Sequence, residues 1–296
     1  MTRIQQVLWK LKMDYIGHPY YVSGNAIYHA LAAELEYAVS QQLHASHGIF
    51  VPGDFGTYPE AHSQSGMKPY LGASLPEVNA YDDLFLFRQP AHHWLLDSRP
   101  RDAINTHDIR TQHRNPALAY EMILGRPEEA QQTHKTIPWY LQAYIHADYS
   151  DMLPLSEAFL NGLQFGGRRN YGYGVTELKA TQMVNLETLD YSRLEDADEW
   201  LLELVTPFVV VSEYPNASND TVPWWWAVDH EGDLRRRDEK IIEQREPYCL
   251  KTVDHGQVVR YAGDDPVETA MNGITRVGTH SKHGFGELRI KPISGL

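Results

Sequence analysis

The spacing of apolar residues predicts strands and one helix in the first half of the chain. From Val7 to Met13 every second residue is apolar, the pattern of a half-buried strand. After Ser23 the apolar residues recur at helical spacing, so we expect a helix capped by Ser23 or Asn25. That helical stripe consists of Ile27, Ala30, Leu31, Leu35, Ala38 and Val39. Alternation returns between Trp139 and His146 and predicts a second half-buried strand.

The second half shows a shorter version of the same pattern. Residues 203–211 read as a strand that Pro207 places at a sheet edge or a bulge. Residues 249–261 read as a hairpin around Asp254, His255 and Gly256. Residues 267–274 read as a helix, and 287–290 as a final strand. Within the first half, residues 46–136 are rich in Pro, Gly and His, with a possible helix at 117–124.

Two glycine-rich segments repeat at a fixed distance. Residues 166–174 and 278–286 both read Gly, five residues, Gly, aromatic, Gly, with corresponding residues 112 positions apart. We call them loop one and loop two. Each follows an Asn-Gly pair and a helix-like segment (155–163 and 267–274), and each leads into a strand-like segment. The shared context predicts a duplicated supersecondary unit.

A composition change divides the chain. Residues 186–198 are acidic and carry few large apolar side chains, so we expect one domain at 1–185 and a second at 199–296. Each half combines strands with one or two helices. This favours an α+β fold built from split βαβ units over a parallel, doubly wound sheet.

Composition narrows the class of protein. The chain has 296 residues, of which 42% are hydrophobic and 22% charged, as in soluble globular proteins. No apolar run reaches the length of a membrane span, so no membrane partner is expected. Cys249 is the single cysteine, which excludes a disulfide scaffold and a Cys-based zinc cluster. The first residues show no signal-peptide pattern, so a cytoplasmic location is expected.

The charge of the chain is at odds with that of its loops. A formal net charge of −13 argues against a general nucleic-acid binder. Yet loop one offers Arg168, Arg169, Asn170 and Tyr171, and loop two offers His280, Ser281, Lys282 and His283. Backbone N–H groups at glycines approach phosphates closely, and aromatic rings stack on bases. Neither loop fits a P-loop or a Rossmann fingerprint. The alternative is a pair of tight helix-to-strand connections without a ligand.

Loop one, Gly166-Gly167-Arg168-Arg169-Asn170-Tyr171-Gly172-Tyr173-Gly174, resembles the glycine-rich loop of the RAMP superfamily of CRISPR-associated proteins. Loop two, ending His283-Gly284-Phe285-Gly286, resembles a C-terminal version, and 22–31 resembles the family's first strand-to-helix region. Residues 46–136 and 212–245 are unmatched. The resemblance implies two ferredoxin-like (RRM-like) domains, the first with a long insertion at about 46–136.

The resemblance also implies a function. Such a chain would bind guide RNA (crRNA) as a capping or end subunit of a CRISPR effector complex in antiviral defence, with other effector subunits as partners. Neither a metal nor another cofactor is implied. The candidate RNA-binding residues are Lys10, Lys12, Gly166, Gly167, Arg168, Arg169, Asn170, Tyr171, Gly172, Gly174, Gly278, His280, Ser281, Lys282, His283, Gly284 and Gly286.

The alternative function is metal-independent cleavage of precursor crRNA, since one branch of the family uses a histidine in its first helix. His29 lies off the apolar stripe of the predicted helix, and His44 and His47 follow that helix. Together with Lys10 or Lys12 they would supply a base, an acid and a cation. With 15 histidines in the chain, an exposed one near any helix is unsurprising.

Two further clusters stand out. Trp224, Trp225 and Trp226 are adjacent, and we expect them to contact a partner subunit. Residues 235–237 are three arginines surrounded by acidic residues, which we interpret as a solvated helix face with paired charges.

Overall fold

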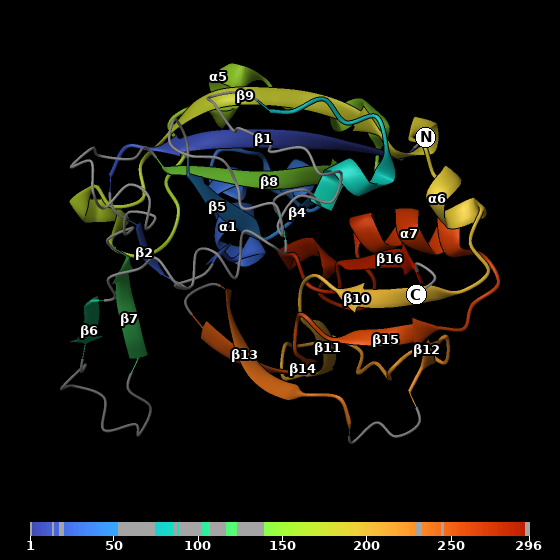
Figure 1. The fold of residues 1–296 in the computed structure, drawn as a ribbon. Helices are drawn as coiled ribbons and strands as arrows, with labels where there is room; N and C mark the ends of the chain where they lie inside the picture. Colours follow the sequence, from blue (N-terminus) through green and yellow to red (C-terminus); the bar gives the residue numbers. More distant parts are fainter. Residues whose placement is uncertain are drawn as a thin grey trace, which may run out of the picture.

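The structure is a computed structural model that describes residues 2–13, 15–17, 21–52, 75–85, 88, 102–106, 117–122, 139–228, 233–243 and 246–293. It is a mixed α/β protein with several antiparallel sheets. Figure 1 shows the largest sheet, from the N-terminal half, above the sheets of the C-terminal half. No helix among the described residues is long and apolar enough to cross a membrane.

The large sheet belongs to the N-terminal half. Its strands run in the order β3 (Tyr21–Val22), β5 (Gly48–Pro52), β8 (Trp139–Ala147), β1 (Arg3–Leu11) and β9 (Thr176–Asn185), and β4 (Leu43–Ala45) also pairs with β8. Helices α1 (Gly24–Ala32) and α5 (Glu157–Leu160) follow β1 and β8 along the chain. The order β5-β8-β1-β9, with both crossovers helical, is that of a split βαβ unit.

One face of this sheet carries the first core. Trp9 of β1 packs beside residues of α1 and α5, and its indole nitrogen donates to the carbonyl oxygen of Leu160 at 2.8 Å. The prediction that β1 and β8 are half-buried was wrong. Leu8 is fully buried and every residue of β8 before Ala147 is buried, so the second face is covered as well. Ile4 and Tyr144 of that face belong to a second core, which also contains residues of the 81–85 segment and of the C-terminal half.

The C-terminal half has its own sheet in the order β12 (Trp226–Ala227), β15 (Val258–Tyr261), β10 (Trp200–Leu204) and β16 (Leu288–Pro292). Helix α7 (Pro266–Thr275) joins β15 to β16 and packs on the sheet. The order matches that of the first unit. However, residues 205–225, all described, contain no helix, so the first crossover is not helical here.

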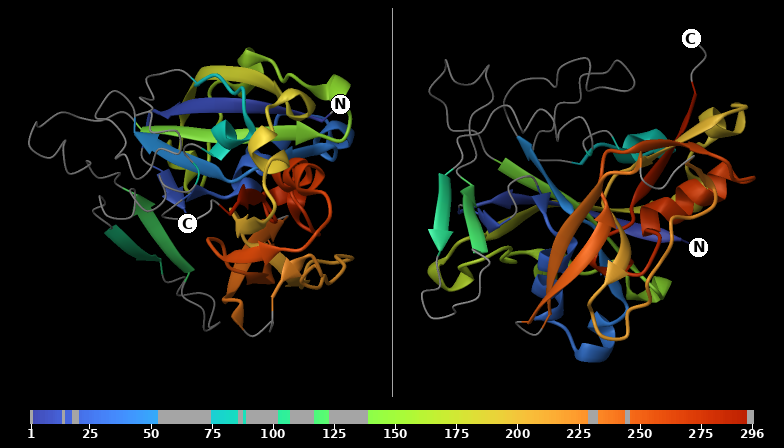
Figure 2. Two further views of the ribbon diagram at one scale, coloured as in Figure 1. Left: turned by 45° about the vertical axis from the view of Figure 1, so that its right-hand side comes forward. Right: turned by 90° about the horizontal axis from the view of Figure 1, so that it is seen from below.

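A separate three-stranded sheet consists of β11 (Phe208–Ser212), β14 (Glu246–Val253) and β13 (Arg236–Glu243). Seen from below, the long orange strands β13 and β14 run to the blue helix α1 of the other half (Figure 2). A 2.9 Å contact between Nε2 of His29 and the carbonyl oxygen of Ile242 joins the two. The sheet therefore brings the C-terminal half against the N-terminal helix.

Several predicted elements differ from those observed. Residues 249–261 do not form a hairpin, because β14 pairs with β11 and β13 whereas β15 pairs with β10 and β12. The described part of the helix predicted at 117–124 is a strand: β7 (Ala117–Met122) lies between β2 (Tyr15–Gly17) and β6 (Asp102–Thr106). The arginines at 236 and 237 lie in β13, not in a helix.

The first helix is capped as predicted but ends early. The hydroxyl oxygen of Ser23 accepts from the backbone N–H of Ala26 at 3.2 Å. Helix α1 stops at Ala32, and a short α2 (Tyr37–Ser40) follows after a break. The stripe predicted through Val39 therefore spans two helices.

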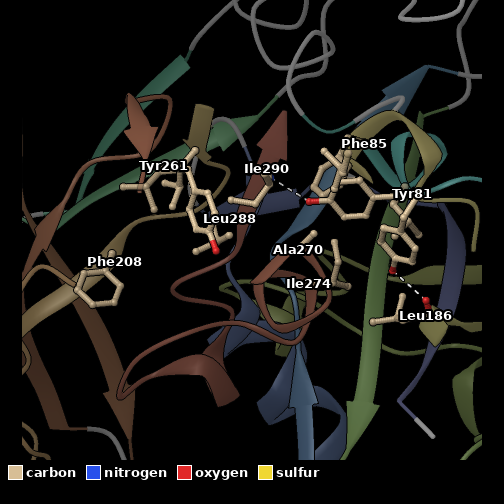
Figure 3. Packing of buried hydrophobic residues seen from close by; sticks show 14 of the residues in the cluster. Tyr81, Phe85, Leu186, Phe208, Tyr261, Ala270, Ile274, Leu288 and Ile290 are labelled. Carbon is tan, nitrogen blue, oxygen red and sulfur yellow. Dashed lines mark hydrogen bonds between the residues drawn. The ribbon is translucent and has the colours of Figure 1, made fainter. Parts of the chain in front are cut away.

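The acidic segment 186–198 packs tightly. It forms a 3₁₀ turn (Leu186–Thr188) and α6 (Ser192–Glu195). Leu186 (Figure 3), Tyr191 and Leu194 belong to the second core. The segment that we expected to mark the domain boundary is therefore packed against the protein through these three side chains. The domain limits 1–185 and 199–296 stay predictions.

The described part of the 46–136 segment helps to join the halves. In the 3₁₀ turn Tyr81–Phe85, the Tyr81 hydroxyl accepts from the backbone N–H of Ile290 at 3.0 Å (Figure 3). Arg88 and Glu287 form a fully buried ion pair with N–O distances of 2.8 and 2.6 Å. Most of 53–138 lies outside the described residues, so its role as an insertion stays a prediction.

Candidate nucleic-acid interface

Loops one and two have the same backbone geometry. Each contains one 3₁₀ turn, Arg169–Tyr171 in loop one and Ser281–His283 in loop two. In each, the residue before the loop donates its N–H to the last glycine: Phe165 to Gly174 at 3.1 Å, and Val277 to Gly286 at 3.0 Å. The sequence repeat therefore encodes a repeated turn.

The last glycine of each loop is required by this turn. Gly174 and Gly286 have φ values of 71° and 79°. A Cβ at Gly174 would lie 1.9 Å from the carbonyl oxygen of Phe165, and one at Gly286 would lie 1.8 Å from that of Val277. These glycines are explained by the fold without any ligand.

Loop two is packed between the two halves of the protein. Lys282 donates to the backbone oxygen and to Oε1 of Gln41 at 3.0 and 2.8 Å, and its Nζ lies 4.8 Å from the centre of the Tyr28 ring. His283 is buried against Tyr28, and His280 Nε2 lies 2.7 Å from the hydroxyl oxygen of Ser212. Its side chains thus make contacts within the protein.

Burial also sets the charge of loop two. Loss of solvent around His283, together with the nearby His280, His29 and Lys282, lowers its pKa to about 3. Burial likewise lowers the pKa of His280. Both imidazoles are therefore neutral near pH 7, which removes two of the cations that the sequence suggested for phosphate contacts.

Loop one has the opposite surroundings. Residues 167–171 are all exposed, and Tyr171 keeps 73% of its surface accessible. Gly167 donates its N–H to the carbonyl oxygen of Ile16 at 2.8 Å, and Nε2 of Gln164 donates to the carbonyl oxygen of Arg169 at 3.4 Å. Arg168 has φ 53°, a left-handed conformation that costs a residue with a Cβ of the order of 1 kcal/mol. The basic side chains of this loop face solvent on a fixed backbone.

Gly167 has no structural reason to be glycine among the described residues. Its φ is outside the positive range, and a Cβ there would meet nothing closer than Ile16, at 3.7 Å. The equivalent position of loop two holds Thr279, so the same turn accepts a β-branched residue. A glycine that the fold does not need indicates close approach of another molecule.

Gly167 lies in a groove of about 650 Å³ between loop one, β2, α1 and β13. We call it the loop-one groove. Cationic side chains enter from two sides, Arg169 from loop one and Lys240 from β13. Asn25 and His29 contribute polar atoms from α1, with Asn25 Nδ2 donating to the carbonyl oxygen of Ile242 at 3.2 Å. Its volume is within the usual range for ligand sites of about 300–1,000 Å³.

The three candidate catalytic histidines do not share this site. His29 lines the groove. His44 stacks on His146 with ring centroids 4.2 Å apart, and its Nε2 lies 2.8 Å from Oδ1 of Asp148. Burial lowers the pKa of His44. His47 is buried, and its Nδ1 accepts from the N–H of Gly24 at 3.2 Å. No three His, Cys, Asp or Glu residues within the described part gather as metal ligands.

Lys10 and Lys12 do not line the loop-one groove. Lys10 lies in β1, and the Nζ of Lys12 is 3.2 Å from a carboxylate oxygen of Glu177. Sequence reasoning missed Lys240 and Asn25 as groove residues. Lys240 falls in a segment without resemblance to the family, and no local pattern indicated that β13 reaches α1. Among the tryptophans, Trp226 is buried against Phe208 and Trp224 is 75% exposed.

Neither the protein-family models nor the curated proteins give a match to this chain. One solved structure, described as "CRISPR associated protein Cas6", aligns with 98% of this chain and 100% of its own. The two are 10% identical with a TM-score of 0.36. A TM-score of this size supports no inference about function.

Proposed function

We propose that this protein binds RNA in the loop-one groove. Gly167 carries the proposal, since it is an exposed glycine that the turn does not need, and it lines the same groove as two cations. A glycine that permits close approach, a guanidinium and an ammonium at one site suit a phosphodiester backbone.

The charge distribution supports RNA as the ligand. The whole chain is acidic, so Arg169 and Lys240 stand out locally and would fix where the backbone lies. Tyr171, two residues after Arg169 in the same loop, is exposed and offers a ring face for stacking. Unpaired RNA is read by such stacking and by contacts to base edges, so a single-stranded segment is the best fit.

More specifically, we propose that the RNA is guide RNA and that the chain is a capping or end subunit of a CRISPR effector complex. The resemblance of both loops to the RAMP signature supports this role. Other effector subunits would be its partners, the complex would act in the cytoplasm in antiviral defence, and exposed Trp224 would be a contact for a partner. RNA sequencing of the protein purified from its host would test the role. A uniform small RNA with a repeat-derived handle is expected, and mixed cellular RNA would contradict it.

The RNA-binding proposal is tested by the salt dependence of binding. Arg169→Ala and Lys240→Ala should each weaken binding of a labelled CRISPR-repeat RNA in a filter assay. Each should also lower the slope of log K against log salt by about 0.7, the value for one contact to a single strand. Arg260→Ala is the matched control, since this exposed arginine pairs with Glu199 outside the groove. Unchanged slopes for both groove variants would refute the proposal.

A second candidate function is metal-independent RNA cleavage, because His29 lines the same groove as Arg169 and Lys240. In that case His29→Ala would reduce cleavage about 10²–10⁴-fold, and wild-type cleavage would persist in EDTA. His44→Ala and His47→Ala are the controls, since neither residue reaches the groove. We expect binding without cleavage. If the wild type cuts the RNA at one phosphodiester in the presence of EDTA, and His29→Ala abolishes this cutting, the second function would be supported instead of binding alone.

A further inference from the structure

A second hollow adjoins the loop-one groove. It has a volume of about 380 Å³ and lies between the C-terminal end of α1, α5 and loop one. Ala33 and Arg169 line both spaces, so the two are neighbours with these residues at their junction. A strand of RNA lying in the groove would therefore have this hollow within reach of an adjacent nucleotide.

The walls of the hollow are more polar than apolar and include one carboxylate. Asn161 and Gln164 contribute amides, while Ala30, Leu163 and the half-buried ring of Phe159 supply apolar surface. The carboxylate is that of Glu34, which is exposed and lies just after α1. An aromatic ring in such a wall is a stacking surface for a base.

The carboxylate makes phosphate an unsuitable occupant, since two anions would repel each other. A base edge that donates hydrogen bonds is favoured instead, as when a Glu or Asp accepts from the amino group of cytosine. Guanine presents two N–H donors side by side on its Watson–Crick edge, which match the two oxygens of a carboxylate. Uracil presents one N–H between two carbonyl oxygens, and these would face the negative charge.

We propose that this hollow binds one unpaired base of the RNA held in the loop-one groove, with guanine preferred over uracil through Glu34. The base stacks on Phe159, while Arg169, at the junction of the two spaces, contacts the phosphate between this nucleotide and its neighbour. The inference rests on the proposed RNA binding and adds base selectivity to it. The acidic residue then gives specificity, and the basic residues give affinity.

The test uses labelled oligouridylates with a single guanosine placed at each position in turn, measured by fluorescence anisotropy. The wild type should bind the best guanosine-containing strand about tenfold more tightly than oligouridylate, in the range of one bidentate base contact. Glu34→Gln should reduce this preference to about twofold or less. Glu36→Gln, the same charge change at an exposed position two residues along, should keep the preference.

A second variant keeps the test independent of Glu34. Phe159→Leu retains apolar bulk but removes the stacking face, and it should weaken binding of the guanosine-containing strand several-fold. Equal wild-type affinities for the two strands, or a preference that survives Glu34→Gln, would overturn the inference. If Arg169→Ala also leaves oligouridylate binding unchanged, the proposed function itself fails. If Arg169→Ala weakens it, only the base site fails.

Discussion

Loops one and two share a backbone turn and differ in almost everything around it. The closing hydrogen bonds differ by only 0.1 Å in length, and both final glycines have positive φ. Loop two is wedged between the halves, with Lys282 on Gln41 and His283 buried. Loop one is exposed from Gly167 to Tyr171. The same signature thus serves as an internal joint in one place and as a free surface in the other.

The difference between the two loops shows which residues of the shared sequence pattern indicate ligand binding. The shared glycines report the turn, because Gly174 and Gly286 are needed whether or not anything binds. The residues that differ are the informative ones. Gly167 of loop one corresponds to Thr279 of loop two, and Arg169 corresponds to Ser281. We infer that RNA affinity resides in those substitutions, and that loop two contributes mainly to stability.

The largest expected effect comes from the shared glycines. Gly174→Ala and Gly286→Ala each force a Cβ into a carbonyl oxygen and a strained φ, which should cost at least about 2 kcal/mol of unfolding free energy. Urea denaturation of both variants measures the loss. If either substitution is tolerated within about 0.5 kcal/mol, the two loops do not share the requirement for this turn.

Acid should destabilise the joint at loop two. The pKa of His283 is lowered from 6.5 to about 3 by burial, so the unfolded chain binds the proton and the folded one does not. The stabilisation is complete above about pH 6.5 and is lost as the pH falls toward 3. Between pH 7 and pH 5 the unfolding free energy should drop by about 2 kcal/mol from this group alone.

Denaturation curves at the two pH values check this expectation, with His283→Gln as the comparison. Lowered pKa values at His44, His146 and His280 add to the same trend. The unfolding free energy of the variant should therefore still depend on pH, but with the contribution of one titrating group removed. An identical pH dependence in the variant and the wild type would contradict the buried, neutral state of His283.

Local patterns predicted the elements, whereas long-range contacts decided the site. The presence of a strand at β1 and the cap at Ser23 depend on neighbouring residues, so the sequence was sufficient to predict them. The burial of both faces of β1 depends on distant segments and was not predicted. The hairpin predicted at 249–261 is absent because its two strands pair in different sheets. Turn residues between two strands do not indicate whether those strands pair with each other. Lys240 could not be placed, since β13 meets α1 from 213 residues away, as measured at Ile242 and His29.

Substitutions of Arg169 and Lys282 should have opposite effects, the first on RNA affinity and the second on stability. Arg169→Ala is expected to weaken RNA binding about tenfold and to leave stability within about 0.5 kcal/mol, as for most surface changes. Lys282→Ala loses two hydrogen bonds and a cation–π contact, and should cost about 1–3 kcal/mol of stability. Its RNA affinity should be unchanged. Parallel denaturation and filter binding would show the crossover, and equal RNA losses would remove the distinction between the loops.

The smallest expected effect concerns the strained residue of loop one. Arg168→Gly relieves the left-handed φ of 53° but adds freedom to the unfolded chain. The unfolding free energy should therefore change by no more than about 0.5 kcal/mol, and Arg168→Ala should be less stable than Arg168→Gly. The ranking of the two variants in urea denaturation is the measurement. The reverse ranking would show that this residue is not strained.

We propose that position 167 is glycine because a ligand approaches it closely, and not because the fold requires glycine there. The variant Gly167→Thr tests this directly, since it introduces the residue that loop two has at the equivalent position, Thr279. The measurement is RNA affinity and unfolding free energy on the same preparation. RNA binding should be weakened at least about tenfold, and the unfolding free energy should stay within about 0.5 kcal/mol of the wild-type value. Unchanged RNA binding in a stable Gly167→Thr variant would show that no ligand approaches this position.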